Sequence, residues 1–158
     1  MPVTQDEFRA ALSRFPSGVT VVTTRDSSGR LHGITVSAFC SVSLDPPLVL
    51  VCIEKSTGSH YALSERGAFV VNILAKDQQH TSEHFASPDS DKFSDFRHRT
   101  GIDGLPVLED VAVNLECRLY QAHDAGDHTV FMGLVEKVTV HDAEPLVYFH
   151  GEYSSICK

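Results

Sequence analysis

One stretch of the sequence, GITVSAFCSVSL at residues 33–44, constrains the fold most because its residues alternate with a period of two. This period predicts a β-strand with one side turned to a core. The expected core side holds Ile34, Val36, Ala38, Cys40, Val42 and Leu44, and the other side holds Thr35, Ser37, Phe39, Ser41 and Ser43. The second side has hydroxyls and a ring but no charge. Either it binds an uncharged ligand surface, or another strand or a second subunit covers it.

The rest of the chain predicts a mainly β domain. Strands are expected at 19–24, 33–44, 48–53, 68–74, 111–125, 128–140 and 145–150. Helices are expected from a capping box at Thr4 and Glu7, from Ser56 or Thr57 to Gly67, and from Asp77 to about Phe85. Strands linked by turns favour a sandwich or a barrel, and the long hairpin strands favour the barrel because closure removes exposed edges. The 158 residues suit a single domain over 1–158.

Composition and missing motifs exclude several functions. The net charge of −8 argues against nucleic-acid binding, and the sequence has no apolar run long enough for a membrane span and no signal peptide. Four separated cysteines without a C-x-x-C motif favour a reduced, cytoplasmic protein. A G-x-G-x-x-G motif, a P-loop and a G-x-S-x-G elbow are all missing. His80 and His84 are four residues apart but have no evident third ligand, so we expect no metal site.

A second polar patch follows the strand at 48–53. Lys55, Ser56 and Thr57 stand at an expected helix start, where hydroxyls, an ammonium group and free backbone N–H groups suit a phosphate. The plainer interpretation is a capped helix with a solvated lysine. Since the two patches belong to consecutive strands, they are expected to be neighbours. A flavin, which has a flat ring and a chain ending in phosphate, would need both.

The ordered motifs FPSGVTVVTT, HGITVSAFCSVSLDPPLVLVCI, FVVNIL, FA at 85–86, GLPVLED, AGDHTVFMGLVE and PLVYFHGEY carry a resemblance over nearly the whole chain. With them the sequence resembles the short-chain flavin reductase family, the reductase components of two-component flavin-dependent monooxygenases. The resemblance implies a Greek-key split β-barrel of the FMN-binding type, with a few short flanking helices, that forms a homodimer. It implies an enzyme that binds FMN or FAD, oxidises NADH or else NADPH, and passes reduced flavin by diffusion to a separate oxygenase.

The resemblance also implies site residues. The ring would lie along 35–38, with the hydroxyl of Ser37 near its N5 atom, and the residues at 52–57 would reach the ribityl chain and phosphate. The implied cofactor-binding set is Thr35, Val36, Ser37, Ala38, Ser41, Cys52, Ile53, Lys55, Ser56, Thr57, Phe85, His128 and Tyr153. Ser41 has an alternative role facing a neighbouring strand or the dimer partner. Asn72, mid-strand, has two open roles: an internally bonded core residue, or a contact to the site.

His128 follows the Gly126–Asp127 turn. Its position alone favours a solvated turn histidine, and the resemblance makes it the catalytic-site residue that holds the nicotinamide. Ser37 stands where some members of the family carry Asn, and Pro16–Ser17 stand where many carry Ala–Thr. Because these positions are expected near the ring, the resemblance does not decide whether the cofactor is FMN or FAD. Hydride transfer needs two stacked rings more than acids or bases, which fits the lack of a catalytic cluster. The alternative function is a flavin- or haem-binding carrier or sensor without NAD(P)H turnover.

Overall fold

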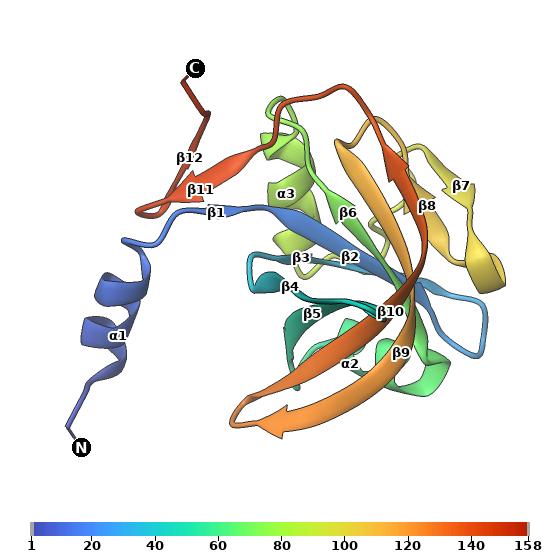
Figure 1. Ribbon diagram of the computed structural model, residues 1–158, viewed down its shortest axis with the longest axis horizontal. Coiled ribbons are helices and arrows are strands. Elements are labelled where there is room, and N and C mark those ends of the chain that lie inside the picture. Colours follow the sequence, from blue (N-terminus) through green and yellow to red (C-terminus); the bar gives the residue numbers. More distant parts are fainter. Residues whose placement is uncertain (1, 158) are drawn as a thin grey trace.

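A computed structural model describes residues 2–157, and Figure 1 shows the arrangement of its elements. The helices are α1 (Gln5–Leu12), α2 (Gly58–Arg66) and α3 (Gln79–Ala86), with a short 3-10 helix η1 (Ile102–Gly104). The strands are β1 (Ser17–Gly18), β2 (Thr20–Arg25), β3 (Leu31–Val36), β4 (Phe39–Leu44), β5 (Pro47–Glu54), β6 (Ala68–Ile73), β7 (His98–Thr100), β8 (Pro106–Leu108), β9 (Val113–Ala125), β10 (His128–Val140), β11 (Val147–Phe149) and β12 (Glu152–Ser154). The predicted mainly β class is confirmed. Over the same residues, no helix is both long and apolar enough to cross a membrane.

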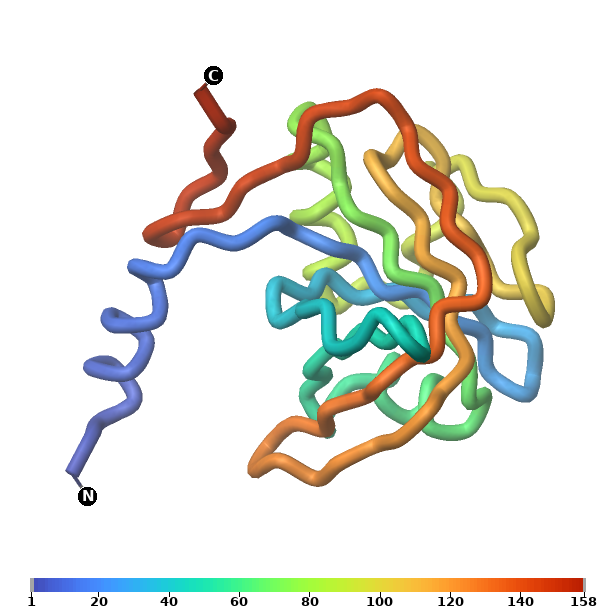
Figure 2. Tube along the Cα trace, viewed as in Figure 1, coloured from blue at the N-terminus to red at the C-terminus, as the bar shows by residue number. Residues whose placement is uncertain are grey.

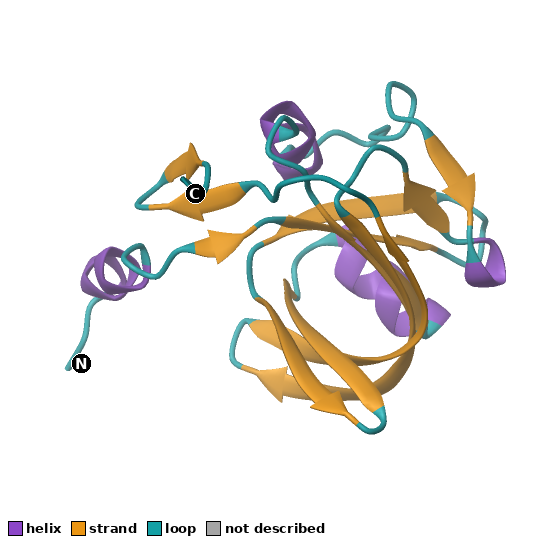
Figure 3. Ribbon diagram, turned by 45° about the horizontal axis from the view of Figure 1, so that its top comes forward, coloured by secondary structure: helices purple, strands orange, loops and turns teal. Residues whose placement is uncertain are grey.

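The main sheet has seven antiparallel strands in the order β3-β2-β6-β9-β10-β5-β4. Its two outer strands, β3 and β4, are consecutive in the chain and are joined by Ser37 and Ala38. The sheet is strongly curved in Figure 3, and α2 packs against it at β2, β3, β5 and β6. Among the described strands, β3 and β4 form no ladder with each other, and the sheet is therefore open at this seam.

The prediction of one continuous strand over 33–44 is wrong. The chain leaves β3 after Val36 and enters β4 at Phe39, because it crosses from one outer edge of the sheet to the other. This break shifts the alternation by one residue, which reverses the side to which the first side chains of β4 point, and β4 has a second register shift between Ser41 and Ser43. Val36 and Phe39 both pack in the core. The residues expected to follow Val36 on the core side, Ala38, Cys40, Val42 and Leu44, are exposed, with Leu44 97% exposed.

Three clusters of apolar side chains stabilise the domain, the smallest of which comprises Ala68, Val70, Leu105 and Val107. The largest cluster fills the concave side of the main sheet and includes Val51, Ile53, Phe69 and Phe131. The second cluster includes Val19, Leu74, Phe85, Phe93 and Leu146. Burial of such side chains contributes about 1.5–3 kcal/mol each relative to exposure, which is the main favourable term in folding.

Asn72 is fully buried in β6, and both the nitrogen and the oxygen of its side-chain amide form hydrogen bonds. Its Nδ2 donates to the carbonyl oxygen of Val21 at 2.8 Å, and to Thr23 Oγ1 at 3.1 Å. Its Oδ1 accepts from the backbone N–H of Leu108 and from Asn114 Nδ2. Asn72 therefore ties β2, β8 and β9 to β6, which settles its open role in favour of the internally bonded core residue.

The predicted helix ends are partly confirmed. Thr4 and Glu7 form the capping box of α1, Thr57 caps α2, and Gly67 ends α2 in the left-handed region at φ +68°. The prediction that Asp77 caps the third helix is wrong, because α3 begins one residue later and has Gln78 at its N-cap without a side-chain bond. The predicted loop after Phe85 contains β7 and η1, and β7 pairs with β8.

The first helix stands apart from the body. It continues into β1, which pairs with β11, and Figures 1 and 2 show this arm beside the body with both chain ends on the same side. The apolar side chains of Phe8, Leu12 and Phe15, which the 3-4 spacing predicts to lie on one face, are exposed, Phe15 by 78%. No residue of α1 is buried within the single chain.

Candidate functional site

The link between β3 and β4 exposes backbone next to small side chains. Ser37 and Ala38 are exposed, and the Ala38 carbonyl accepts a 3.0 Å hydrogen bond from the backbone N–H of Cys52 in β5. We call Ser37 and Ala38 the hinge. The Val36 side chain is in the core, and Thr35 Oγ1 donates to the Ser82 carbonyl at 2.6 Å. At these two positions a ligand would therefore meet backbone groups, and Ser37 offers the free hydroxyl.

Strand register places His128 on the same face of the sheet as the hinge. Cys52 is opposite Val130 across the β5–β10 ladder, and Ala38 is bonded to Cys52 on its other side. His128 is two residues from Val130 in β10, so its side chain points to the same side, about 7 Å further along the strand. The structure thus brings Ala38, Cys52 and His128 together on one surface.

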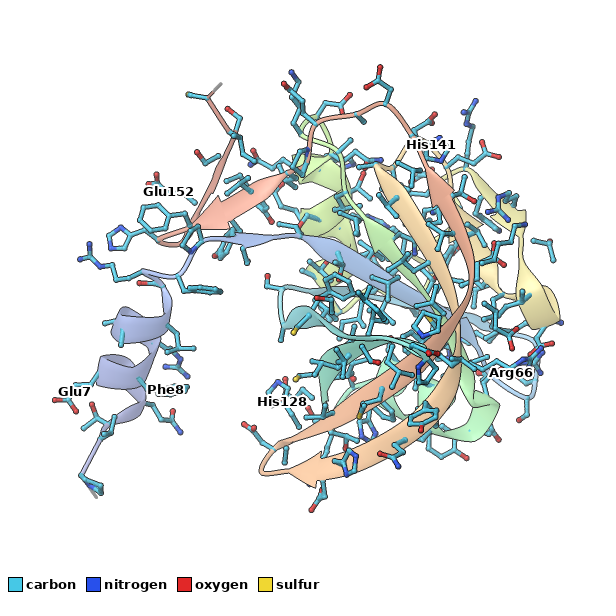
Figure 4. All side chains as sticks on the ribbon, in the orientation of Figure 1. Glu7, Phe8, Arg66, His128, His141 and Glu152 are labelled. Atoms are coloured by element: carbon cyan, nitrogen blue, oxygen red, sulfur yellow. The ribbon has the colours of Figure 1, made fainter. Side chains whose placement is uncertain are left out.

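His128 stands at the start of β10, directly after the turn from β9, and Figure 4 shows it at the edge of the body. Its Nδ1 lies 2.7 Å from Asp127 Oδ1, and its side chain is 42% exposed. This hydrogen bond holds the pKa of the Asp127 carboxyl below its usual value. An ionised carboxylate accepts hydrogen bonds only, so Nδ1 carries the proton and Nε2 is left for another partner.

The residues predicted to hold the phosphate separate into two groups. Lys55 Nζ donates to the Gly126 carbonyl at 2.7 Å and pairs with Asp124, both at the end of the β9–β10 hairpin. Ser56 Oγ donates to Glu54 Oε1. Thr57 accepts the backbone N–H of His60 as the N-cap of α2, and it lines a cavity. Of these three residues, Thr57 is the one that lines the cavity.

This cavity, of about 500 Å³, lies between β3, the start of α2 and the segment that follows α3. We call it the β3 cavity. Its walls include His32, Gly33, Thr57, Ser59 and Phe85, and its outer part includes Arg30 and the segment 87–90. Phe85 and Thr57, both predicted from the sequence, therefore meet in one place. The volume is typical of small-molecule sites.

Phe85 forms a buried wall of the β3 cavity, and Gly33 allows it to lie there. A Cβ atom on Gly33 would lie 2.6 Å from the Phe85 ring. Lys92 closes the same corner, because its Nζ donates to the carbonyls of Gly33 at 3.1 Å and of Phe85 at 2.9 Å. Desolvation lowers the pKa of Lys92.

His32 is a wall residue that the sequence analysis missed. Its Nε2 lies 2.9 Å from Asp26 Oδ2, and both side chains are more than four-fifths buried. Hydrogen bonds from Ser28 and from His32 hold the pKa of Asp26 well below its usual value. The Nδ1 atom of His32 faces Gly58 at the start of α2. The strands expected at 19–24 and 33–44 are separated by only eight residues, and Asp26 and His32 lie near the two ends of this link, so the sequence could have indicated that they are neighbours.

Tyr153 and Thr35 meet at Ser82, another residue that the sequence analysis missed. The hydroxyls of Tyr153 and Ser82 lie 2.8 Å apart, and the Ser82 carbonyl accepts from Thr35. Tyr153 also packs edge-on against Tyr148. The buried Ser82 of α3 thus connects β12 to β3 through its contacts with Tyr153 and with Thr35, which lies two residues before the hinge.

The other predicted residues lie as follows. Ile53 is fully buried and points into the core, so only its backbone borders the site. Ser41 is exposed in β4, opposite Val49. His80 and His84 both lie against Phe96, and His84 Nε2 is 3.0 Å from the Lys92 carbonyl. Between residues 2 and 157, no group of three or more potential ligands is arranged for a metal ion.

Comparison with known proteins gives a consistent result. A family model described as "Flavin reductase like domain" matches residues 12–156. An NADH-dependent flavin reductase of Rhodococcus sp is 42% identical over 160 residues, covering 98% of this chain and 88% of that protein. The reductase subunit HsaB of a flavin-dependent monooxygenase from Rhodococcus jostii is 38% identical, covering 94% of this chain and 76% of that protein. The NADH:FAD oxidoreductase SgcE6 of Streptomyces globisporus, solved with NAD and FAD fragments, superimposes with a TM-score of 0.93 at 33% identity, covering 99% of this chain and 95% of that one.

Proposed function

The chain belongs to the family of flavin reductase-like domains, and we infer from this that it is an NAD(P)H:flavin oxidoreductase. It reduces FMN or FAD with hydride from NADH and supplies reduced flavin to a separate monooxygenase component. The observation that supports this most is the single surface on which the hinge, Cys52 and His128 lie together.

The residues of this surface fit a flavin. Small side chains at Ser37 and Ala38 let a flat ring approach the exposed backbone, whose N–H and C=O groups match the polar edge of the ring. From the hinge, β3 leads back to Gly33, and β5 leads on to Thr57. Both strands therefore run toward the β3 cavity, where the start of α2 suits a phosphate.

The residues of the chain hold the flavin ring and the nicotinamide in position for the reaction. When bound, the flavin supplies the redox chemistry by accepting a hydride. The hinge backbone orients the ring, and the Ser37 hydroxyl hydrogen-bonds to its edge. His128 holds the nicotinamide from the neighbouring strand, and Asp127 fixes the imidazole so that Nε2 faces the nicotinamide. Holding two rings about 3–3.5 Å apart supplies a large part of the acceleration, so no acid or base is required.

Three finer features belong to the same proposal. The seam between β3 and β4 makes the sheet a Greek-key split barrel rather than a closed one. The protein is a homodimer, in which the exposed apolar side chains of α1 are buried against a second copy, because exposed patches of this kind favour association. It works in the cytoplasm, where its four free thiols stay reduced.

A direct assay tests the function. The protein is mixed with NADH and either FMN or FAD, and the loss of NADH absorbance is followed, with a flavin-free sample as control. We expect fast NADH oxidation that requires flavin. Tight flavin binding without NADH consumption would instead favour a carrier or sensor.

A further inference from the structure

The β3 cavity extends beyond what an FMN molecule needs. Gly33, in its wall, precedes Ser37 of the hinge by four residues, which is roughly 13 Å along β3. A flavin ring at the hinge would therefore place its first phosphate near His32 and the start of α2, at the inner end of the cavity. The outer end, formed by Arg30 and the segment 87–90, would remain unfilled.

The outer end is suited to a second phosphate group. Arg30 is exposed, and one N–H of its guanidinium donates to the Ser90 carbonyl at 3.2 Å, which directs the group across the opening. A guanidinium has five N–H donors, and the described contacts of Arg30 use one of them. Lys92, which is bonded to the Gly33 and Phe85 carbonyls at the inner corner, adds a second positive charge to the lining of the cavity, and Asp89 adds one negative charge. The remaining N–H donors of Arg30 are therefore the main attraction for an anionic group at the outer end.

The inner end is fixed before any ligand arrives. Asp26 Oδ1 accepts three hydrogen bonds, from the backbone N–H groups of Ser28 and Arg30 and from the Ser28 hydroxyl. Its other oxygen holds His32. The same carboxylate thus sets both the imidazole and the backbone of Arg30, so the two walls keep their spacing. A preorganised site loses less free energy on binding.

We propose that the β3 cavity takes the adenosine diphosphate end of FAD, with Arg30 as a specificity-determining residue, so that the chain prefers FAD to FMN. This proposal rests on the proposed function. The second phosphate contacts Arg30, and the adenosine lies against the segment 87–90. FMN, which ends at its single phosphate, reaches the inner end only.

Binding rather than turnover gives the main test. The dissociation constants of FAD and FMN are measured by the change in flavin fluorescence, for the full chain and for Arg30→Ala. We expect FAD to bind the unaltered chain at least tenfold more tightly than FMN. Arg30→Ala weakens FAD binding by about tenfold and FMN binding by less than about twofold, because a charge-assisted hydrogen bond to phosphate is lost. ADP, added as a probe, displaces FAD, and the substitution weakens that displacement.

Two further variants separate the charge from its position. Arg97→Ala removes a positive charge outside this cavity, where Arg97 pairs with Glu109 and Asp110. It should leave both dissociation constants unchanged. Arg30→Lys keeps the charge but not the fork of donors, and it should recover part of the FAD affinity.

Several results would overturn the proposal. One is equal binding of FAD and FMN by the unaltered chain. Another is an equal effect of Arg30→Ala on both flavins. A third concerns NADH, which also carries an adenosine diphosphate: if Arg30→Ala raises the KM for NADH with saturating FMN and leaves FAD binding unchanged, the cavity serves the nicotinamide substrate. In each case NADH oxidation by the unaltered chain would still support the proposed function, which fails only if neither flavin supports turnover.

Discussion

The contact between Gly33 and Phe85 makes Gly33→Ala the sharpest test of how the site is held. The new Cβ atom would lie 2.6 Å from two carbons of the Phe85 ring and 3.2 Å from Phe93. Phe85 is fully buried, with the rings of Phe93 and Phe96 at centroid distances of 5.3 Å and 5.1 Å. The clash is relieved either by displacement of the Phe85 ring toward the β3 cavity or by movement of β3 away from α3, and both disturb the wall of the cavity.

Overpacking of this kind costs about 1–3 kcal/mol in unfolding free energy. For a domain of this length, each kcal/mol lowers Tm by about 2–4 °C, so a fall of roughly 2–12 °C is expected in a calorimetric or fluorescence melt. Since Gly33 also lines the β3 cavity, flavin should bind more weakly. The double variant Gly33→Ala with Phe85→Leu should cost less than the sum of the two single changes, because the clash is removed.

Gly58→Ala is the matched control. It lines the same cavity, but its new Cβ atom would meet only the His32 ring, at an ordinary 3.7 Å. Its effect should lie within about 1 kcal/mol and can be stabilising, since alanine loses less backbone entropy on folding. The argument fails if Gly33→Ala and Gly58→Ala have the same Tm and the same flavin affinity.

Three further changes have distinct readouts. His128→Ala should raise the KM for NADH several-fold in steady-state assays and leave the flavin dissociation constant nearly fixed; an unchanged KM would contradict the proposed nicotinamide contact. The pKa of Asp26 is lowered by folding, so this carboxylate contributes stability above its ordinary value of about 4 and loses that contribution as the pH falls below it. Asp26→Asn should therefore flatten the acid limb of a Tm-against-pH curve, and an unaltered limb would refute this. If the proposed homodimer forms through α1, Phe8→Asp combined with Leu12→Asp should give a monomer in sedimentation experiments, whereas the unaltered chain sediments as a dimer; a double variant that still sediments as a dimer would rule out α1 as the contact.

Local patterns in the sequence predicted most strands of the main sheet, the hairpin at Gly126 and the cap at Thr57, because each depends on residues close together in the chain. They did not predict the short strands β1, β7, β8 and β12. The break at the hinge could not be predicted in this way. The hinge contains neither glycine nor proline, and the alternation of small and apolar residues continues through it. What separates β3 from β4 is their position on opposite edges of the sheet, which depends on the strands placed between them.

The same limit applies to the site. Lys55 next to Ser56 and Thr57 suggested one phosphate-binding patch, yet the partners of Lys55 are Asp124 and Gly126, some 70 residues further along the chain. Conversely, Ser82 has no local pattern that marks it, and its role follows only from its contacts to Thr35 and Tyr153. Fold class and family therefore followed from the sequence, whereas the partner of each polar side chain required the structure.

The use of these polar groups bears on how the enzyme would release its product. The ammonium group of Lys55 donates a hydrogen bond to the β9–β10 hairpin. The hydroxyl of Thr35 donates to a carbonyl oxygen, and that of Ser56 donates to a carboxylate oxygen. These groups therefore make the site rigid and are largely unavailable for contacts with a ligand. A rigid site of exposed backbone and small side chains orients a flat ring at low entropic cost. Because the hinge offers few charged contacts, we expect this site to bind the ring with only moderate affinity. Such a balance suits a reductase whose reduced flavin must leave and reach another protein, and it assigns most of the affinity to the phosphate end, in the β3 cavity.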